Sequence, residues 1–183
     1  MANYKHVFED GYSYFITIVT HLRNPILIQN IALLRESFRV SKLEYDYNID
    51  AVVIMPDHLH MIITPQYAKE YPHIVRRIKQ HFSKQCDPKY YAHLQQSQSR
   101  RKEGYLPVWQ KKYYEHTLRN AKDFKLHLDY IHFNPVKHNV TDSAGSWEYS
   151  SFRKYVKYWE NIMSNGVILV CMLILCLSGR LIL

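Results

Sequence analysis

The feature that most constrains the fold is a pair of apolar segments separated by two turn-forming residues. The segments "NIDAVVIM" (48–55) and "HLHMIIT" (58–64) are rich in β-branched and other apolar side chains, which favour strands. Between them, Pro56 fixes one backbone angle and Asp57 favours turn geometry. The sequence therefore predicts a hairpin of two antiparallel strands, with two histidines in the second strand.

The residues around this hairpin alternate between strand and helix patterns. Aromatic and β-branched residues at 12–21 predict an earlier strand. Apolar residues at helical spacing predict an amphipathic helix over 29–45 and a basic amphipathic helix over 71–86. The polar, Gln/Ser-rich residues 91–104 predict a mobile loop.

The second half of the chain continues the alternation. A short strand is expected over 113–118, followed by a helix that Asn120 caps. Pro135 disfavours helical geometry at the preceding residue, so this helix is expected to end near Asn134. A final short helix is expected over 146–159. The order β-α-β-β-α-β-α predicts an α+β fold, a ferredoxin-like antiparallel sheet with helices packed on one face.

Length and composition favour one basic, intracellular domain. The 183 residues suit a single domain, expected over 1–160, and the formal net charge of +8 favours a polyanionic partner, nucleic acid before membrane. Three cysteines without a CxxC pair argue against a disulfide framework or a cysteine zinc site, and they suit a reducing compartment. We expect a cytoplasmic, nucleoid-associated protein.

The end of the chain, residues 161–183, differs in composition. It holds eleven consecutive apolar residues, at 167–177, whereas a bilayer-spanning helix needs about 20. Three interpretations remain open: a packed terminal segment, a marginal tail anchor, and a frame-shifted or truncated end without an evolved role. The anchor ranks lowest, so a membrane partner is not expected.

Two histidines and a tyrosine carry the chemical signal. In a strand, His58 and His60 point to the same side and could form half of a divalent-metal site. Tyr130 and Asn134 share a helix face, and the amide oxygen of Asn134 could be a third ligand for Mg²⁺ or Mn²⁺. A metal that polarises a phosphodiester would let the Tyr130 phenol attack it. The alternative is structural: satisfied histidines, a tyrosine at the core edge and a helix C-cap.

Four motifs in order carry a resemblance to a known family. "PDHLHMI", "VWQKKYYEHTLRN", "HLDYIHFNPVKHN" and "WEYSSF" resemble the single-tyrosine HUH transposases, and more closely the REP-associated tyrosine transposases. The resemblance extends over residues 12–155. It implies that His58 and His60 are the metal-binding pair, that Tyr130 is the nucleophile and that Asn134 is the third metal ligand.

The resemblance also implies an activity: metal-dependent nicking and rejoining of single-stranded or hairpin DNA through a 5′-phosphotyrosine. Basic side chains would contact phosphates and aromatic ones would stack on unpaired bases. The basic candidates are Arg76, Arg77, Lys79, Lys111, Lys112 and Lys137. The aromatic candidates are Trp109, Tyr113 and Tyr114, and the candidate proton carriers are His116, His127, His132 and His138.

Two other functions remain open from the sequence. The chain could be a hairpin-DNA-binding protein that no longer catalyses, or an RNA-directed nuclease with the same metal pair. The sequence also leaves open whether the protein is a monomer or a homodimer, with the tyrosine acting within one chain or across two.

Overall fold

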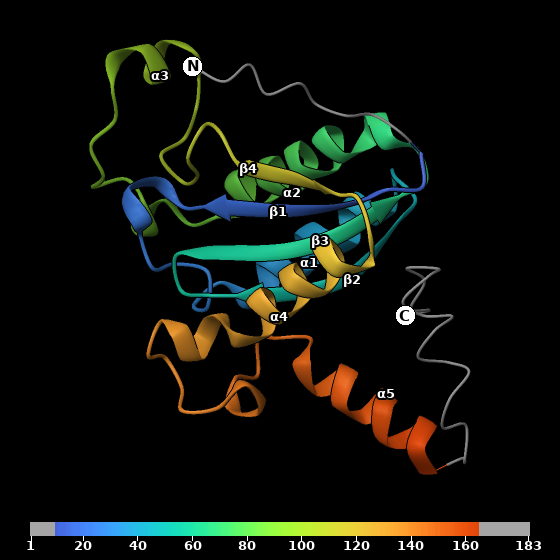
Figure 1. Cartoon of the computed structure of the whole chain (residues 1–183). Coiled ribbons are helices and arrows are strands. Elements are labelled where there is room, and N and C mark those ends of the chain that lie inside the picture. The colour runs from blue at the N-terminus through green and yellow to red at the C-terminus, as the bar shows by residue number, and fades with distance from the viewer. Residues whose placement is uncertain (1–9, 165–183) are drawn as a thin grey trace, which may run out of the picture.

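A computed structural model describes residues 10–164 of the chain, so the apolar run at 167–177 lies outside the described residues. Its centre is a four-stranded sheet in the order β2-β3-β1-β4, in which every pair of neighbours is antiparallel (Figure 1). The strands are β1 (Ser13–Val19), β2 (Tyr47–Ile54), β3 (His58–Pro65) and β4 (Tyr114–Leu118). This is the strand order of two interleaved βαβ units, as in the ferredoxin-like plan.

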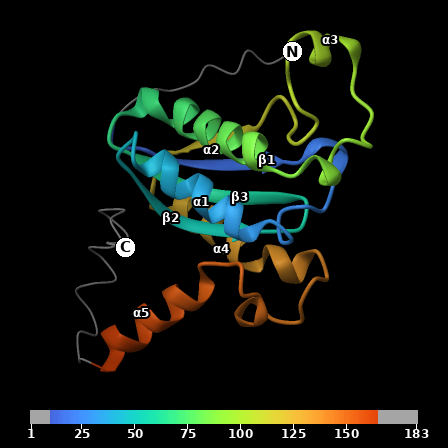
Figure 2. The same cartoon turned by 180° about the vertical axis from the view of Figure 1, so that it is seen from behind.

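Helices cover both faces of this sheet. α1 and α2 pack side by side on one face (Figure 2), and α4 crosses the other (Figure 1). The α-helices are α1 (Ile31–Lys42), α2 (Tyr71–Gln85), α3 (Gln98–Lys102), α4 (Ala121–Lys137) and α5 (Phe152–Ser164). Among the described residues, no helix is both long and apolar enough to cross a membrane.

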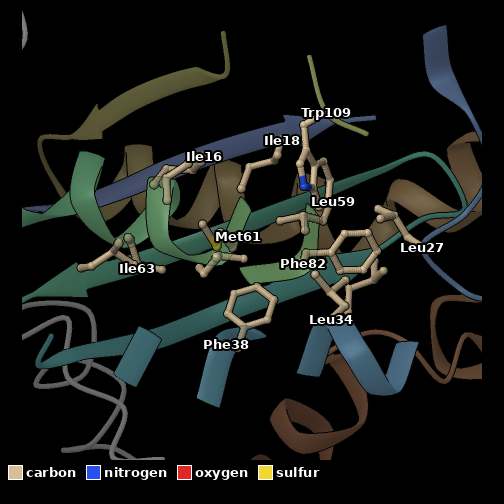
Figure 3. Packing of buried hydrophobic residues seen from close by; sticks show 14 of the residues in the cluster. Ile16, Ile18, Leu27, Leu34, Phe38, Leu59, Met61, Ile63, Phe82 and Trp109 are labelled. Atoms are coloured by element: carbon tan, nitrogen blue, oxygen red, sulfur yellow. The ribbon is translucent and has the colours of Figure 1, made fainter. Parts of the chain in front are cut away.

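The side chains of β1 and β3 alternate between two cores. Ile16, Leu59 and Met61 point into the larger core beneath α1 and α2 (Figure 3). Phe15 and Ile62 point into a smaller core beneath α4. Because alternate residues of a strand face opposite ways, the two histidines that flank Leu59 lie on the α4 face.

The predicted α+β class and antiparallel sheet are confirmed, and the placement of the helices differs in one respect. The expectation was helices on one face, which holds for α1 and α2 only. α4 lies on the opposite face because that face also carries buried apolar residues, among them Phe15, Val53 and Ile62, which need a cover.

Two predicted helix boundaries differ from the structure. α4 continues past Asn134 and includes the buried Pro135, since the helical bias against residues before proline is a preference that local packing can override. α5 begins at Phe152 rather than near residue 146. The preceding residues instead bind the outer strand: Tyr149 accepts a hydrogen bond from the Ile54 amide at 2.8 Å.

The predicted loop 91–104 is more structured than expected. It contains α3, which Ser97 caps by accepting a hydrogen bond from the Arg100 amide. The Arg100 guanidinium then donates to the backbone carbonyl of Trp109 at 2.7 Å. This hydrogen bond fixes residues 91–104 to the rest of the protein. The polar composition of the segment does not predict such a contact.

Candidate active site

The two histidines of β3 are each held through one ring nitrogen. The Oγ1 of Thr17, on the neighbouring strand β1, lies 2.8 Å from Nδ1 of His60. Asp57, in the turn before β3, places a carboxylate oxygen 2.6 Å from Nδ1 of His58. Because Nδ1 is engaged on both rings, Nε2 is the nitrogen that each ring can offer to a ligand.

Helix α4 brings its candidate residues against this pair. The Tyr130 ring lies with its centroid 5.1 Å from that of His60, and the His138 ring lies 5.4 Å from His58. Asn134 is four residues after Tyr130 and four before His138, so it occupies the same helix face between them. The structure therefore brings the predicted set of His58, His60, Tyr130 and Asn134 together.

Three polar atoms at this point are buried without a partner. Among the described residues, neither Nε2 of His60 nor the two amide atoms of Asn134 have a hydrogen bond. Asn134 is fully buried and His60 is 5% exposed. A buried polar group without a partner costs about 1–3 kcal/mol, so orphaned atoms in native proteins call for an explanation. A bound ion would give the His60 nitrogen and the Asn134 oxygen their missing partner.

The ring of His60 is also in the form that binds metals. Burial, and to a smaller extent the positive charges of neighbouring groups including His58 and Lys137, lower the pKa of His60 to about 3. The imidazole is therefore neutral at physiological pH, as a metal ligand must be. Two imidazole nitrogens and an amide oxygen form a donor set that suits a divalent ion such as Mn²⁺ or Mg²⁺.

Asp57 and Arg23 support the histidine pair. The Asp57 carboxylate accepts a hydrogen bond from the Arg23 guanidinium at 2.8 Å and contacts His58 at 2.6 Å. Burial raises the pKa of Asp57, but hydrogen bonds from His58 and Arg23 outweigh it, so the pKa lies below its usual range. The carboxylate thus stays charged and orients the imidazole, as carboxylates behind metal-binding histidines do.

Sequence reasoning missed Asp57 and Thr17, the two residues that contact the Nδ1 atoms of the histidines. Asp57 was interpreted only as a turn residue, and Thr17 only as part of a strand. A carboxylate directly before the first histidine was a usable signal for Asp57, because such groups orient metal-binding imidazoles. The role of Thr17 depends on the register of β1 against β3, in which Thr17 lies opposite His60.

Tyr130 differs from its neighbours in being accessible. Its side chain is 36% exposed, whereas both histidines and Asn134 are buried. The ring packs edge-on against Phe15 at 5.8 Å between centroids, and the Lys137 ammonium lies 4.9 Å from the ring centroid. The hydroxyl can therefore reach a phosphate in solvent, and Lys137 supplies a positive charge beside it.

The other candidate histidines fall in three different places. His132 faces away from Tyr130, 3.0 Å from the Ser151 hydroxyl, and burial lowers its pKa to about 4. His138 lies at the edge of the site, where burial and then the nearby His58 lower its pKa. His116 and His127 form a separate cluster under the first turns of α4.

The predicted phosphate-contacting residues divide into groups. Arg76, Lys79 and Lys111 line a pocket of about 650 Å³ between α2 and residues 100–113. Arg77 pairs with Glu44 at 2.7 Å. Lys112 is exposed, and Lys137 lies beside Tyr130. Burial is the main cause that lowers the pKa of Lys79 to about 8, with a smaller effect from Arg100.

The pocket and the histidine pair share one end of the sheet. Thr20, directly after β1, forms a β-bridge with Trp109. The Gln110 amide donates a hydrogen bond to the backbone carbonyl of Val19 at 2.9 Å. Val19 is paired with His58 in the sheet. Trp109 and Gln110, which border the pocket, therefore lie against the end of β1 that pairs with His58.

The predicted base-stacking residues differ in accessibility. Trp109 is buried against Phe82, with ring centroids 5.1 Å apart, so its ring face is not open for stacking. Its apolar neighbours in the larger core explain the difference from the prediction. Tyr113 is partly buried beside that core, whereas Tyr114 is 57% exposed and packs edge-on against Phe15 on the α4 face.

Comparison with known proteins identifies the family of the chain. The family model described as "Transposase IS200 like" matches residues 9–134, which include both histidines, Tyr130 and Asn134. A Haemophilus influenzae protein assigned to the REP-associated tyrosine transposases is 33% identical over 159 residues, covering 86% of this chain and 89% of that protein. The REP-associated tyrosine transposase of Escherichia coli is 29% identical over 158 residues, covering 85% and 86%.

A solved structure extends the agreement to the fold. A REP-associated tyrosine transposase bound to a REP hairpin superposes with a TM-score of 0.68 at 28% identity, covering 86% of each chain. Sequence and fold thus match over the same large share of the chain. The chain belongs to the IS200-like transposase family, among its REP-associated tyrosine transposases.

Proposed function

We propose that this transposase nicks and rejoins single-stranded hairpin DNA through a 5′-phosphotyrosine on Tyr130, with His58, His60 and Asn134 holding Mg²⁺ or Mn²⁺. One observation carries the proposal: buried, unpartnered ligand atoms of His60 and Asn134 lie beside an accessible tyrosine. Because the Tyr130 ring lies 5.1 Å from that of His60 in the same chain, the proposal has Tyr130 acting in cis.

Hairpin DNA as the substrate rests on two supports. The solved relative is bound to a REP hairpin, and this chain carries a formal net charge of +8. Phosphates would contact Lys137 beside the nucleophile, and Arg76, Lys79 and Lys111 around the pocket. Such a substrate would place the protein at the nucleoid.

The chemistry is a transesterification whose atoms balance. The Tyr130 oxygen forms a bond to phosphorus, the bond from phosphorus to the 3′ oxygen breaks, and the proton lost by the phenol ends on that 3′ oxygen. A bound divalent ion would polarise the phosphate and offset the charge that develops on it. One phosphodiester replaces another, so the free 3′-OH can attack the phosphotyrosine and restore the strand.

A denaturing gel tests the proposal. Full-length protein is incubated with labelled hairpin DNA and Mn²⁺, beside Tyr130→Phe, and with Tyr67→Phe as the matched control because Tyr67 is exposed and distant from the site. We expect a covalent protein–DNA band from the unmutated protein and from Tyr67→Phe. Tyr130→Phe should give none while still shifting DNA on a native gel.

The metal ligands are tested in the same assay. EDTA should remove the band, and Asn134→Ala should need at least about tenfold more Mn²⁺ for half-maximal product, because one of three ligands is lost. Intact DNA binding without any band, across palindromes that flank the gene, would favour the DNA-binding protein without catalysis. Cleavage that requires a 2′-OH would favour the RNA-directed nuclease.

A further inference from the structure

A second group of ligand-type side chains lies under the first turns of α4. The Asp123 carboxylate is 2.9 Å from Nε2 of His116 and 3.1 Å from Nδ1 of His127. The two imidazole rings stack with centroids 4.8 Å apart. One ligand atom from each residue lies within 4.8 Å of the other two, and all three side chains are partly buried.

This group is separate from the histidine pair on β3. Phe15, on β1, contacts a histidine of each group: its ring centroid lies 5.6 Å from that of His60 and 4.7 Å from that of His127. Both groups therefore occupy the same face of the sheet beneath α4, and each has an imidazole in contact with the Phe15 ring. His116 comes from β4 and the other two residues come from α4, so the group joins a strand to a helix.

The spacing between the carboxylate and each imidazole matches what one metal ion requires. Nitrogen and carboxylate ligands lie about 2.0–2.2 Å from Zn²⁺, so two of them at tetrahedral or octahedral angles are about 3.0–3.4 Å apart. Oδ1 of Asp123 lies 3.1 Å from Nε2 of His116 and 3.1 Å from Nδ1 of His127. Side-chain exposure of 21–27% leaves room for water as a further ligand.

A hydrogen-bonded cluster without a metal is the competing explanation. In the structure Nδ1 of His127 is also 2.9 Å from the backbone carbonyl of Asp123, a bond in which that nitrogen carries the proton. An ion would require the other tautomer and would replace this bond. The two explanations therefore differ in a measurable quantity, the affinity of the group for a transition metal.

We propose that His116, Asp123 and His127 form a second metal site, specific for a Zn²⁺-type transition metal and separate from the catalytic ion. Two imidazoles favour such ions over Mg²⁺, which takes oxygen ligands. His127 precedes Tyr130 by less than one helical turn. An ion at this site fixes that part of α4 to β4 and so fixes the height of the nucleophile above the sheet.

Zn²⁺ binding in a background without the catalytic pair tests this site. Full-length His58→Ala/His60→Ala protein is dialysed against Zn²⁺, and bound metal is measured; Co²⁺ absorption reports the ligand geometry. We expect one ion per chain to remain. Adding Asp123→Asn, which keeps the size of the side chain, should weaken that binding by at least about tenfold.

Two controls keep the result interpretable. His93→Gln removes an exposed histidine elsewhere and should leave binding unchanged. Thermal unfolding without metal checks that each variant is folded. Loss of all Zn²⁺ binding in the His58→Ala/His60→Ala protein, or full binding after Asp123→Asn and His127→Gln together, would overturn the second site. No DNA is used, so the outcome is independent of the strand-transfer assay.

Discussion

A single hydroxyl decides which nitrogen His60 can offer to a metal. Thr17 engages Nδ1 of this buried ring from the neighbouring strand, at 2.8 Å. Thr17→Val keeps the shape and removes the hydroxyl, so the ring loses its fixed orientation. We expect Mn²⁺ affinity to fall by about 10–100-fold, the usual cost of losing a group behind a metal ligand. Calorimetric titration measures it.

Thr117→Val is the matched control for that change. Thr117 is also a buried strand residue, but its register partner is Tyr14, whose side chain belongs to the larger core on the opposite face of the sheet. Its variant should bind Mn²⁺ like the unmutated protein. Equal losses in both variants would mean that the hydroxyl of Thr17 acts through general stability alone.

At this scale the sequence predicted the residues whose spacing is local. His58 and His60 on one strand face, and Tyr130 and Asn134 on one helix face, follow from the periods of the elements. Thr17 could not be predicted in the same way, because its contact with His60 depends on pairing between strands that are 43 residues apart. Trp109 was misjudged because burial depends on the same long-range packing.

At the scale of elements, strand β2 carries a buried carboxylate that opposes stability. Burial raises the pKa of Asp50 to about 6, although a hydrogen bond from Thr64 at 2.6 Å partly offsets it. A raised carboxylate pKa adds stability below the unfolded value near 4 and loses it as pH rises through 6. The native state is therefore penalised at neutral pH.

Asp50→Asn should remove this penalty. We expect the free energy of unfolding at pH 7.5 to increase by about 1–3 kcal/mol, since two pKa units correspond to about 3 kcal/mol. At pH 3.5 the difference should largely disappear, because the carboxyl is protonated in the folded state and mostly protonated in the unfolded state. Urea unfolding at the two pH values measures it, with exposed Asp46→Asn as control. An equal effect at both pH values would contradict the assignment.

The elements themselves were predictable where periodicity is long and clear. β1 to β4, α1 and α2 lie within a few residues of their predicted ranges. The end of α4 and the start of α5 were not predictable from periodicity, because each is decided by contacts outside the element. Packing that buries Pro135 prolongs α4, and pairing of residues 149–151 with β2 delays the start of α5.

At the scale of the whole molecule, the basic pocket predicts how DNA affinity depends on salt. Arg76 lines the pocket between α2 and residues 100–113. If it contacts a phosphate, Arg76→Ala should lower the slope of log affinity against log salt by about one and weaken all hairpins to a similar degree. Fluorescence anisotropy at several salt concentrations measures the slope. Lys89→Ala, which removes a lysine paired with Asp87 outside the pocket, should leave it unchanged.

The global fold was predictable in class but incomplete in layering. The order of elements implied the antiparallel α+β sheet. It did not show that α4 would cover the second face, since that requires knowing that Phe15, Val53 and Ile62 share a face once the register is set. The gathering of basic residues into a pocket beside one sheet end likewise arises only in three dimensions.

In the mechanism that we propose, the nucleophile Tyr130 and the third metal ligand Asn134 share helix α4, which limits how the site can fail. If α4 lifts from the sheet, Tyr130 and Asn134 leave together, because a helix moves as a rigid unit. In that mechanism, lifting α4 would remove the tyrosine and one metal ligand at the same time. Water would then meet no fully liganded ion, so hydrolysis of the DNA strand without capture by Tyr130 would be disfavoured.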